Sequence, residues 1–321
     1  MTTPAPGWAL RLFARQSNEW EARPALNPSR PGKPLLGGVG FGGKLRLSDR
    51  AIMLDVAVTM RLSDSDLRFI VETVATERRD YDHVIELVRD KPDLLEPMLQ
   101  DRKLSERLIS EQEAFARVSP YLLFSALLRR VWRDVERQSF VLERDDRGKR
   151  IPVFGGPRIA ELLGEPDLRE YLVEMLCSFV RTNTGVLYFK DRGTWRKRKF
   201  SDLDMDDMIA LCHLVEPEGK PRLYKRIGDI ALFLTGIYPD HTALSARRPR
   251  TQAAQGRVAA DYEREARHFY SVCARQPEPP WTASIFEALA ENFNLARAAL
   301  NTLSDRYLEP LRERYFEPPF A

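Results

Sequence analysis

Cysteine and histidine are scarce in this sequence, with three cysteines and four histidines among 321 residues. The cysteines lie far apart, each within an apolar pattern typical of a helix: Cys177, Cys212 and Cys273. An odd, scattered set in a chain of this length argues against a disulfide framework and favours a reducing compartment. Cys212 and His213 are neighbours, but on a helix they would point about 100° apart and could not act as a catalytic pair.

Long apolar runs are also missing. The most apolar stretch, residues 227–238, contains Asp229 and is shorter than the roughly 20 residues that a membrane-spanning helix needs. Residues 1–8 lack a charged region followed by an apolar one, so they do not resemble a signal peptide. We therefore expect a cytoplasmic protein that makes no contact with a membrane.

The chain lacks an excess of one charge as well. Its 50 basic and 47 acidic residues give a net charge of +3. This balance excludes a global field that would draw the whole protein onto nucleic acid or a membrane, so any preference for a polyanion must come from local clusters. An apolar content of 43% with 30% charged residues is typical of a soluble globular protein.

Helical periodicity dominates what is present. Apolar residues recur at helical spacing after two polar starts, Ser63 to Asp66 and Ser119-Pro120. The pattern from Trp281 to Tyr307 predicts one long helix with an apolar stripe. The predicted fold class is mainly α, a multi-helix globular body with two β-hairpins. We predict five regions: a Gly/Pro-rich N-terminal arm (1–47), an N-terminal helical region (48–138), a winged-helix-like region with a basic hairpin (139–200), core helices (201–276) and a C-terminal long helix (277–321).

The order of elements between residues 120 and 200 is that of a winged helix: a helix, an extended segment, two short helices and a hairpin. In the extended segment, Pro152 limits the returning arm of the first hairpin to an edge strand. The second short helix would be the recognition helix, yet it carries Asp167, Glu170 and Glu174. Acidic residues there argue against insertion into a groove lined with phosphates.

The second hairpin is the most informative feature of the chain. Two runs of strand-favouring residues flank an Asp-Arg-Gly-Thr turn at 191–194, and the returning arm carries four consecutive cations. Four adjacent charges cannot all be buried unpaired, so we expect an exposed positive ribbon. A second basic cluster after the core helices would extend the same surface. The predicted contact residues are Lys190, Arg192, Trp195, Arg196, Lys197, Arg198, Lys199, Arg247, Arg248 and Arg250.

Histidine supports an alternative from a different class. A carboxylate stands three residues before two of the histidines, in the pairs Asp80 with His83 and Glu265 with His268. On helices this spacing puts both groups on one face, as in the di-iron sites of helical bundles. The alternative function is therefore a helical-bundle metalloprotein, although Asp80 also suits a helix cap and such spacing arises easily by chance.

Two further motifs only resemble functional ones. The glycines from Gly38 to Gly43 fit a dinucleotide or phosphate loop, but Leu45 stands where a magnesium-binding hydroxyl is needed. The acidic run from Asp202 to Asp207 resembles the start of a calcium loop, but Asp207 replaces the required glycine. A glycine-rich arm and a helix cap explain them better, and we predict no cofactor.

The sequence favours a non-catalytic interaction or regulatory protein over an enzyme. Its expected ligand is a polyanion, such as nucleic acid, or an acidic protein surface, which the basic hairpin would contact. The partner, the oligomeric state and the pathway are left open by these patterns.

Overall fold

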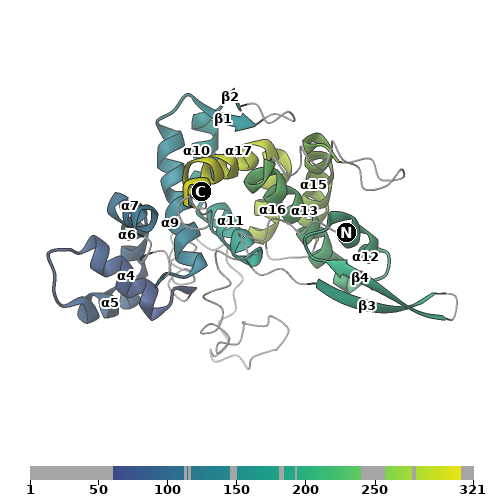
Figure 1. Cartoon of the computed structure of the whole chain (residues 1–321), viewed down its shortest axis with the longest axis horizontal. Coiled ribbons are helices and arrows are strands. Elements are labelled where there is room, and N and C mark those ends of the chain that lie inside the picture. The colour runs from purple at the N-terminus through teal and green to yellow at the C-terminus, as the bar shows by residue number, and fades with distance from the viewer. Residues whose placement is uncertain are drawn as a thin grey trace, which may run out of the picture.

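A computed structural model describes residues 61–111, 114, 117–144, 150–180, 184–191, 194–239, 257–276 and 280–311. Within these ranges the protein is mainly helical, as predicted (Figure 1). The predicted N-terminal arm, its glycine motif and the segment 240–256 lie outside the described residues. None of the described helices combines the length and apolarity that crossing a membrane would require.

The helices spread along the longest axis of Figure 1. At the left lie α4 (Asp64–Val74), α5 (Tyr81–Asp90), η1 (Pro92–Leu94), α6 (Leu95–Leu99) and α7 (Arg102–Ser110). In the centre, α9 (Pro120–Glu136), α10 (Gly156–Gly164) and α11 (Pro166–Ser178) pack against one another. The remaining helices are α12 (Met205–Cys212), η2 (Pro217–Gly219), α13 (Lys220–Ile237), α15 (Ala259–Ala274), α16 (Pro280–Glu291), α17 (Phe293–Leu303) and η3 (Ser304–Leu308).

Short polar motifs start the helices where the sequence predicts. Ser63 and Asp66 form a capping box at α4, in which the Ser63 amide donates to Asp66 Oδ2 over 2.9 Å. The other oxygen of the fully buried Asp66 accepts from the Ser119 amide at 2.8 Å. Ser119 in turn caps α9 through Leu122. One buried carboxylate therefore joins the starts of two helices that are distant in sequence.

Buried apolar side chains from Leu62 to Leu311 form one core cluster. Helix α13 crosses its middle, and its residues from Ile227 to Ile237 are all buried. The predicted apolar stripe of the C-terminal region is buried as well, but it lies on two helices rather than one, because the chain breaks at Asn292 between α16 and α17. The core therefore confirms the periodicity, whereas the single long helix is a correction.

The strands form two separate hairpins. β1 (Phe140–Arg144) pairs only with β2 (Arg150–Phe154), and β3 (Thr184–Asp191) pairs only with β4 (Thr194–Ser201) among the described residues. The β1–β2 hairpin buries Val141 against the core but leaves Phe154 78% exposed. In a winged helix the strands of both hairpins would belong to one sheet. Here β1 and β2 do not share a sheet with β3 and β4.

Helix α11, the would-be recognition helix, is part of the core. Its residues 168–173 and Met175 and Leu176 are buried. A helix in this position cannot enter a nucleic-acid groove without losing its packing. The acidic residues of α11 already argued against contact with nucleic acid. Its burial is a second, steric argument against that contact.

Candidate functional site

The β3–β4 hairpin extends from the body at the lower right of Figure 1. Its arms pair without a bulge from Thr184 opposite Ser201 to Asp191 opposite Thr194. Helix α12 packs against β4, and the Ser201 amide donates to Asp207 on that helix over 3.0 Å. The hairpin is therefore held at its base, while its distal part projects.

Two described side chains show which face of the β3–β4 hairpin turns toward the body. Phe200, near the base, is half-buried and packs against the core. Lys197 is exposed, and it forms no ion pair or hydrogen bond within the described part of the chain. Because residues alternate between the faces of a strand, positions 197 and 200 belong to opposite faces. The face of position 200 turns toward the body, and the face of position 197 turns away from it.

Arg226 on α13 fixes the base of the hairpin, a role that the sequence did not suggest. Its guanidinium donates to the Asp202 carbonyl at 3.0 Å, just after β4, and to Ser178 Oγ at 2.9 Å, before β3. The same group lies 3.8 Å from the centroid of the Phe179 ring. A single arginine therefore joins both ends of the hairpin to the core helix. Its signal in the sequence was only a cation at the polar start of an apolar helix.

The other predicted contact residues are placed by the backbone or lie outside the described structure. Lys190 is in β3, and Trp195, Arg196, Arg198 and Lys199 are in β4. The remaining members of the predicted surface lie outside the described residues: Arg192, Arg247, Arg248 and Arg250.

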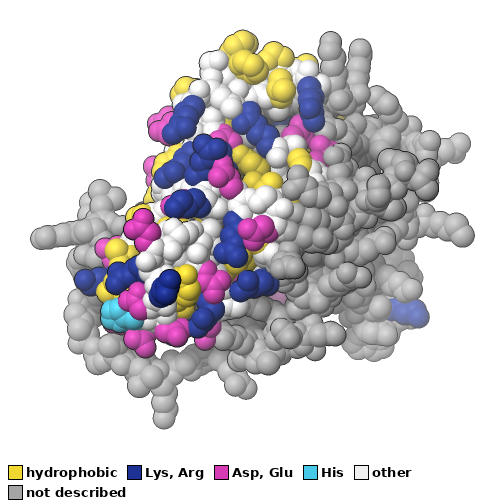
Figure 2. Space-filling model, turned by 60° about the vertical axis from the view of Figure 1, so that its left-hand side comes forward, with side chains coloured by type: hydrophobic (Ala, Val, Ile, Leu, Met, Phe, Trp, Pro, Cys, Tyr) yellow, Lys and Arg dark blue, Asp and Glu magenta, His cyan; other side chains and the backbone are white. Residues whose placement is uncertain are grey.

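Figure 2 shows a face of the body for comparison, on which basic and acidic side chains are intermixed. Among the described residues many surface charges pair, such as Arg89 with Asp64 and Arg78 with Asp80. Yellow side chains gather at the top of this view, the end where the β1–β2 hairpin lies in Figure 1. The visible described surface thus has no large field of one sign, in agreement with the composition.

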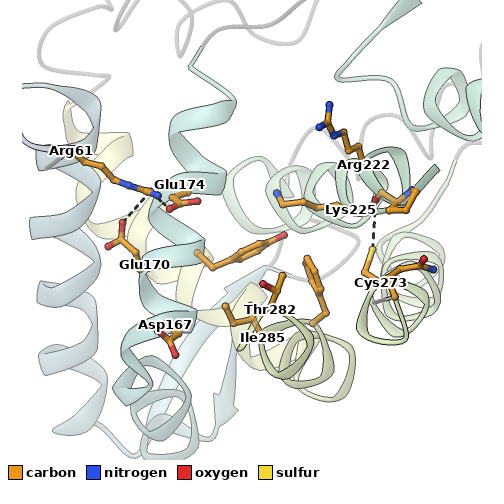
Figure 3. Close-up of a pocket in the computed structure, with 13 residues that line it drawn as sticks. Arg61, Asp167, Glu170, Glu174, Arg222, Lys225, Cys273, Thr282 and Ile285 are labelled. Carbon is orange, nitrogen blue, oxygen red and sulfur yellow. Dashed lines mark hydrogen bonds and ion pairs between the residues drawn. The ribbon is translucent and has the colours of Figure 1, made fainter. Parts of the chain in front are cut away.

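A pocket of about 440 Å³ lies between α11, α13, α15 and α16 (Figure 3). Arg61, Glu170 and Glu174 border one side, where Arg61 pairs with Glu174 and its Nη1 lies 3.6 Å from Glu170 Oε1. Tyr121 donates to the same Glu170 oxygen at 2.5 Å. Lys225 of α13 borders the other side. The charges on the first side are therefore paired with one another.

Behind Lys225 lies a buried carboxylate, Asp229, which is 1% exposed. It accepts hydrogen bonds from Tyr171 at 2.5 Å, Tyr270 at 3.0 Å and Lys225 Nζ at 2.6 Å. Burial, and then the negative charge of Asp229, hold the pKa of both phenols well above the ordinary value, so they remain donors. This cluster joins α11, α13 and α15.

Among the described residues that line the pocket, no two groups form a nucleophile and its base. Cys273 lines it but is 3% exposed, and its Sγ lies 3.9 Å from the Pro221 carbonyl oxygen. Arg61, Glu174 and Lys225 have internal partners, although the buried Glu170 Oε2 accepts no hydrogen bond within the described residues. Pairing of this kind is typical of a structural network. We assign the pocket's charges to holding the helices together.

The residues of the metal alternative are not brought together. Asp80 and His83 lie at the start of α5, at the left end of Figure 1, whereas Glu265 and His268 lie on α15 toward the right end. Asp80 pairs with Arg78, Glu265 pairs with Arg257, and both histidines are exposed. Across the described ranges, no group of three or more His, Cys, Asp or Glu residues could hold a metal ion. The di-iron-like site is therefore withdrawn, because the fold separates its two halves.

The acidic run before α12 is a helix cap, as the sequence analysis favoured. Asp204 accepts from the amides of Asp206 and Asp207 at 2.9 Å and 3.1 Å. Asp206 itself pairs with Arg257. These carboxylates are thus engaged with the protein's own donors.

No protein-family model matches this chain, and neither a curated protein nor a solved structure shows significant similarity to it. Its function must therefore be inferred from the geometry of its own residues.

Proposed function

We propose that this protein is a non-catalytic, cytoplasmic interaction or regulatory protein that contacts a polyanion or an acidic protein surface through the β3–β4 hairpin. The observation that carries the proposal is the projection of a two-stranded ribbon whose described cation, Lys197, is exposed on the side away from the body. Four consecutive cations in β4 supply the charge, from Arg196 to Lys199. Cations on a projecting ribbon can approach phosphates or carboxylates without desolvating the helical body.

The anchoring of the hairpin supports this role. Arg226, Asp202 and Asp207 hold its base to α12 and α13, which limits the entropy lost when a ligand binds. Within the proposal, only the order of elements in residues 139–200 is winged-helix-like, and β3–β4 stands in the position of the wing. The buried α11 takes no part in contact with the ligand. The basic cluster Arg247, Arg248 and Arg250 would extend the same surface.

The experiment compares a charge-neutralised hairpin with a matched control. The test variant carries Arg196→Gln, Lys197→Gln, Arg198→Gln and Lys199→Gln. The control neutralises four exposed cations of the N-terminal helical region: Arg78, Arg89, Arg102 and Lys103. Both variants lose four charges, so a difference between them reports position rather than net charge.

The readout is elution from heparin and nucleic-acid columns in a salt gradient. We expect the hairpin variant to elute at much lower salt, with a flatter dependence of affinity on salt, because fewer counterions are released. The control should elute close to the unmutated protein. Equal losses in the two variants would contradict a specific role of the hairpin. Absence of salt-sensitive retention by unmutated protein would remove nucleic acid as the partner and leave the acidic protein surface.

A further inference from the structure

The strand register gives the two faces of the β3–β4 ribbon different chemistry. Directly opposed residues of an antiparallel pair belong to the same face, and successive residues alternate between faces. Tyr188 stands opposite Lys197, and Lys190 stands opposite Trp195. Val186 stands opposite Lys199. One face therefore holds three lysine positions and two aromatic positions.

The other face has a different composition. It holds Arg196 opposite Phe189 and Arg198 opposite Leu187, followed by Phe200 opposite Gly185. Phe200 packs against the core, so near its base this face turns toward the body. The exposed Lys197 belongs to the opposite face. By register, the face that turns away from the body near the base therefore holds the positions of Tyr188, Lys190, Trp195, Lys197 and Lys199.

On this outward face, aromatic and cationic positions alternate along both strands. In β3 the order is Tyr188 then Lys190, and in β4 it is Trp195 then Lys197. Each aromatic position thus has a lysine opposite it and another two residues along its own strand. Successive positions on one face of a strand are about 7 Å apart. The pattern combines aromatic side chains, on which flat rings can stack, with lysines that can neutralise phosphates.

We infer that the outward face of the hairpin binds single-stranded nucleic acid, with Tyr188 and Trp195 stacking on bases and the three lysines contacting phosphates. This inference rests on the proposed function and adds to it the class of partner. Proteins that bind single strands without sequence preference combine a positive surface with aromatic side chains on which bases stack. In a duplex the base faces are already stacked, so the aromatic positions would contribute little. An acidic protein surface would use the lysines alone.

The first test uses unmutated protein and four probes at equal salt. The probes are an oligothymidylate, an abasic oligomer with the same phosphate backbone, a duplex of the same length, and heparin. Stacking on one base contributes a factor of about ten, so the oligothymidylate should bind at least tenfold more tightly than the abasic oligomer. Heparin should be retained as a polyanion.

The second test uses Tyr188→Val and Trp195→Val, which keep a strand-favouring residue at each position. Each variant should lose about tenfold in affinity for the oligothymidylate while its retention on heparin is unchanged. The control is Phe189→Val on the other face, which should bind the oligothymidylate like the unmutated protein. Circular dichroism and thermal unfolding show whether each variant is folded, and the first test needs no variant.

The outcomes separate this inference from the proposed function. Equal affinity for the oligothymidylate and the abasic oligomer, or tighter binding to a duplex of the same length, overturns the single-strand inference while a polyanion surface stands. Retention on none of the probes overturns both the inference and the polyanion form of the proposed function. Loss of oligothymidylate affinity in the Phe189→Val variant alone also overturns the inference, because it assigns the contact to the other face.

Discussion

The helical body and the β3–β4 hairpin differ in whether their cations are buried and paired with carboxylates. Arg129 and Arg169 are each 4% exposed in the body, and both donate to one carboxylate, Glu96. Lys197 in the hairpin is exposed and has no hydrogen-bond or ion-pair partner within the described ranges. Basic residues of the body therefore stabilise the fold where a carboxylate of the fold meets them. Under the proposed function, the exposed cation of the hairpin instead contacts an external ligand.

The Glu96 network ties the N-terminal helices to the centre of the molecule. Glu96 lies on α6, Arg129 on α9 and Arg169 on α11. Burial by itself raises the pKa of Glu96, but the charges of Arg129 and Arg169 outweigh it and hold the pKa at about 2. Arg169 also donates to the Leu163 carbonyl at 2.5 Å and stacks over Trp132. Removing Glu96 leaves two buried guanidinium groups without their carboxylate, whereas removing one arginine leaves Glu96 paired with the other.

The largest effect is expected from Glu96→Ala. The substitution leaves two buried guanidinium groups without a carboxylate, which costs about 3–5 kcal/mol of unfolding free energy. Urea unfolding measures the loss. The matched control is Glu106→Ala, because Glu106 forms an exposed pair with Arg102 and should contribute little. Retention of the Glu96 variant on heparin should match that of unmutated protein, provided it is assayed where it is folded. A cost no greater than that of the control would show that the network adds nothing.

The lowered pKa of Glu96 predicts that the protein loses stability at acidic pH. The pKa of Glu96 is about 2 in the folded protein and 4.5 in the unfolded chain, so its stabilisation is complete above about pH 4.5 and is lost as the pH falls toward 2. The shift corresponds to about 3 kcal/mol. Unfolding free energies measured from about pH 6 downward should fall less steeply in Glu96→Gln, which cannot ionise. Parallel curves for the two proteins would contradict the assignment.

A smaller effect is expected from Gly228→Ala in α13. A Cβ at this position would lie 2.7 Å from Cε1 of Tyr270, a fully buried ring whose hydroxyl is bonded to Asp229. The ring must move and weaken that bond, which should cost about 1–3 kcal/mol in thermal unfolding. Gly164→Ala is the control, because its Cβ would meet only Trp132 at 3.9 Å. Equal stability of the two variants would mean that the contact relaxes freely.

The smallest effect on stability, and the sharpest contrast with the body, is expected from Lys197→Gln. The unfolding midpoint should not change, because the side chain is exposed and unpaired within the described structure. The slope of log affinity against log salt should fall by about one for a polyanion ligand. An altered unfolding midpoint with an unchanged salt slope would show that Lys197 stabilises the fold and does not contact the ligand.

Local patterns predicted much of the fold. The caps at Ser63, Ser119 and Asp204, and the buried face of α13, follow from residues within a few positions of each other. The pairing of β3 with β4 is equally local, since two strand-favouring runs flank a short turn. Such features depend on periodicity and turn chemistry, which are visible in a sequence without knowledge of its partners.

The break in the C-terminal helix shows where local patterns fail. Apolar residues keep helical spacing through Asn292, but the chain bends there and Arg267 of α15 donates to the carbonyls of Ala290 and Glu291 at 2.6 Å and 2.8 Å. These carbonyls are freed by the end of α16 and need a donor. Only packing of α15 against α16 brings that arginine to them. The metal alternative failed for the same reason, because spacing places a carboxylate near its own histidine but does not place one helix beside another.

By itself, then, the amino-acid order determined the helices, their starts, the two hairpins and the concentration of charge in β4, because each depends on neighbours along the chain. Only the tertiary structure decided which arginines face Glu96, that α11 is buried, that Arg226 fixes the base of the hairpin, and which face of the ribbon turns outward. These properties depend on contacts between residues tens of positions apart, and long-range contacts are set by the packing of the whole core.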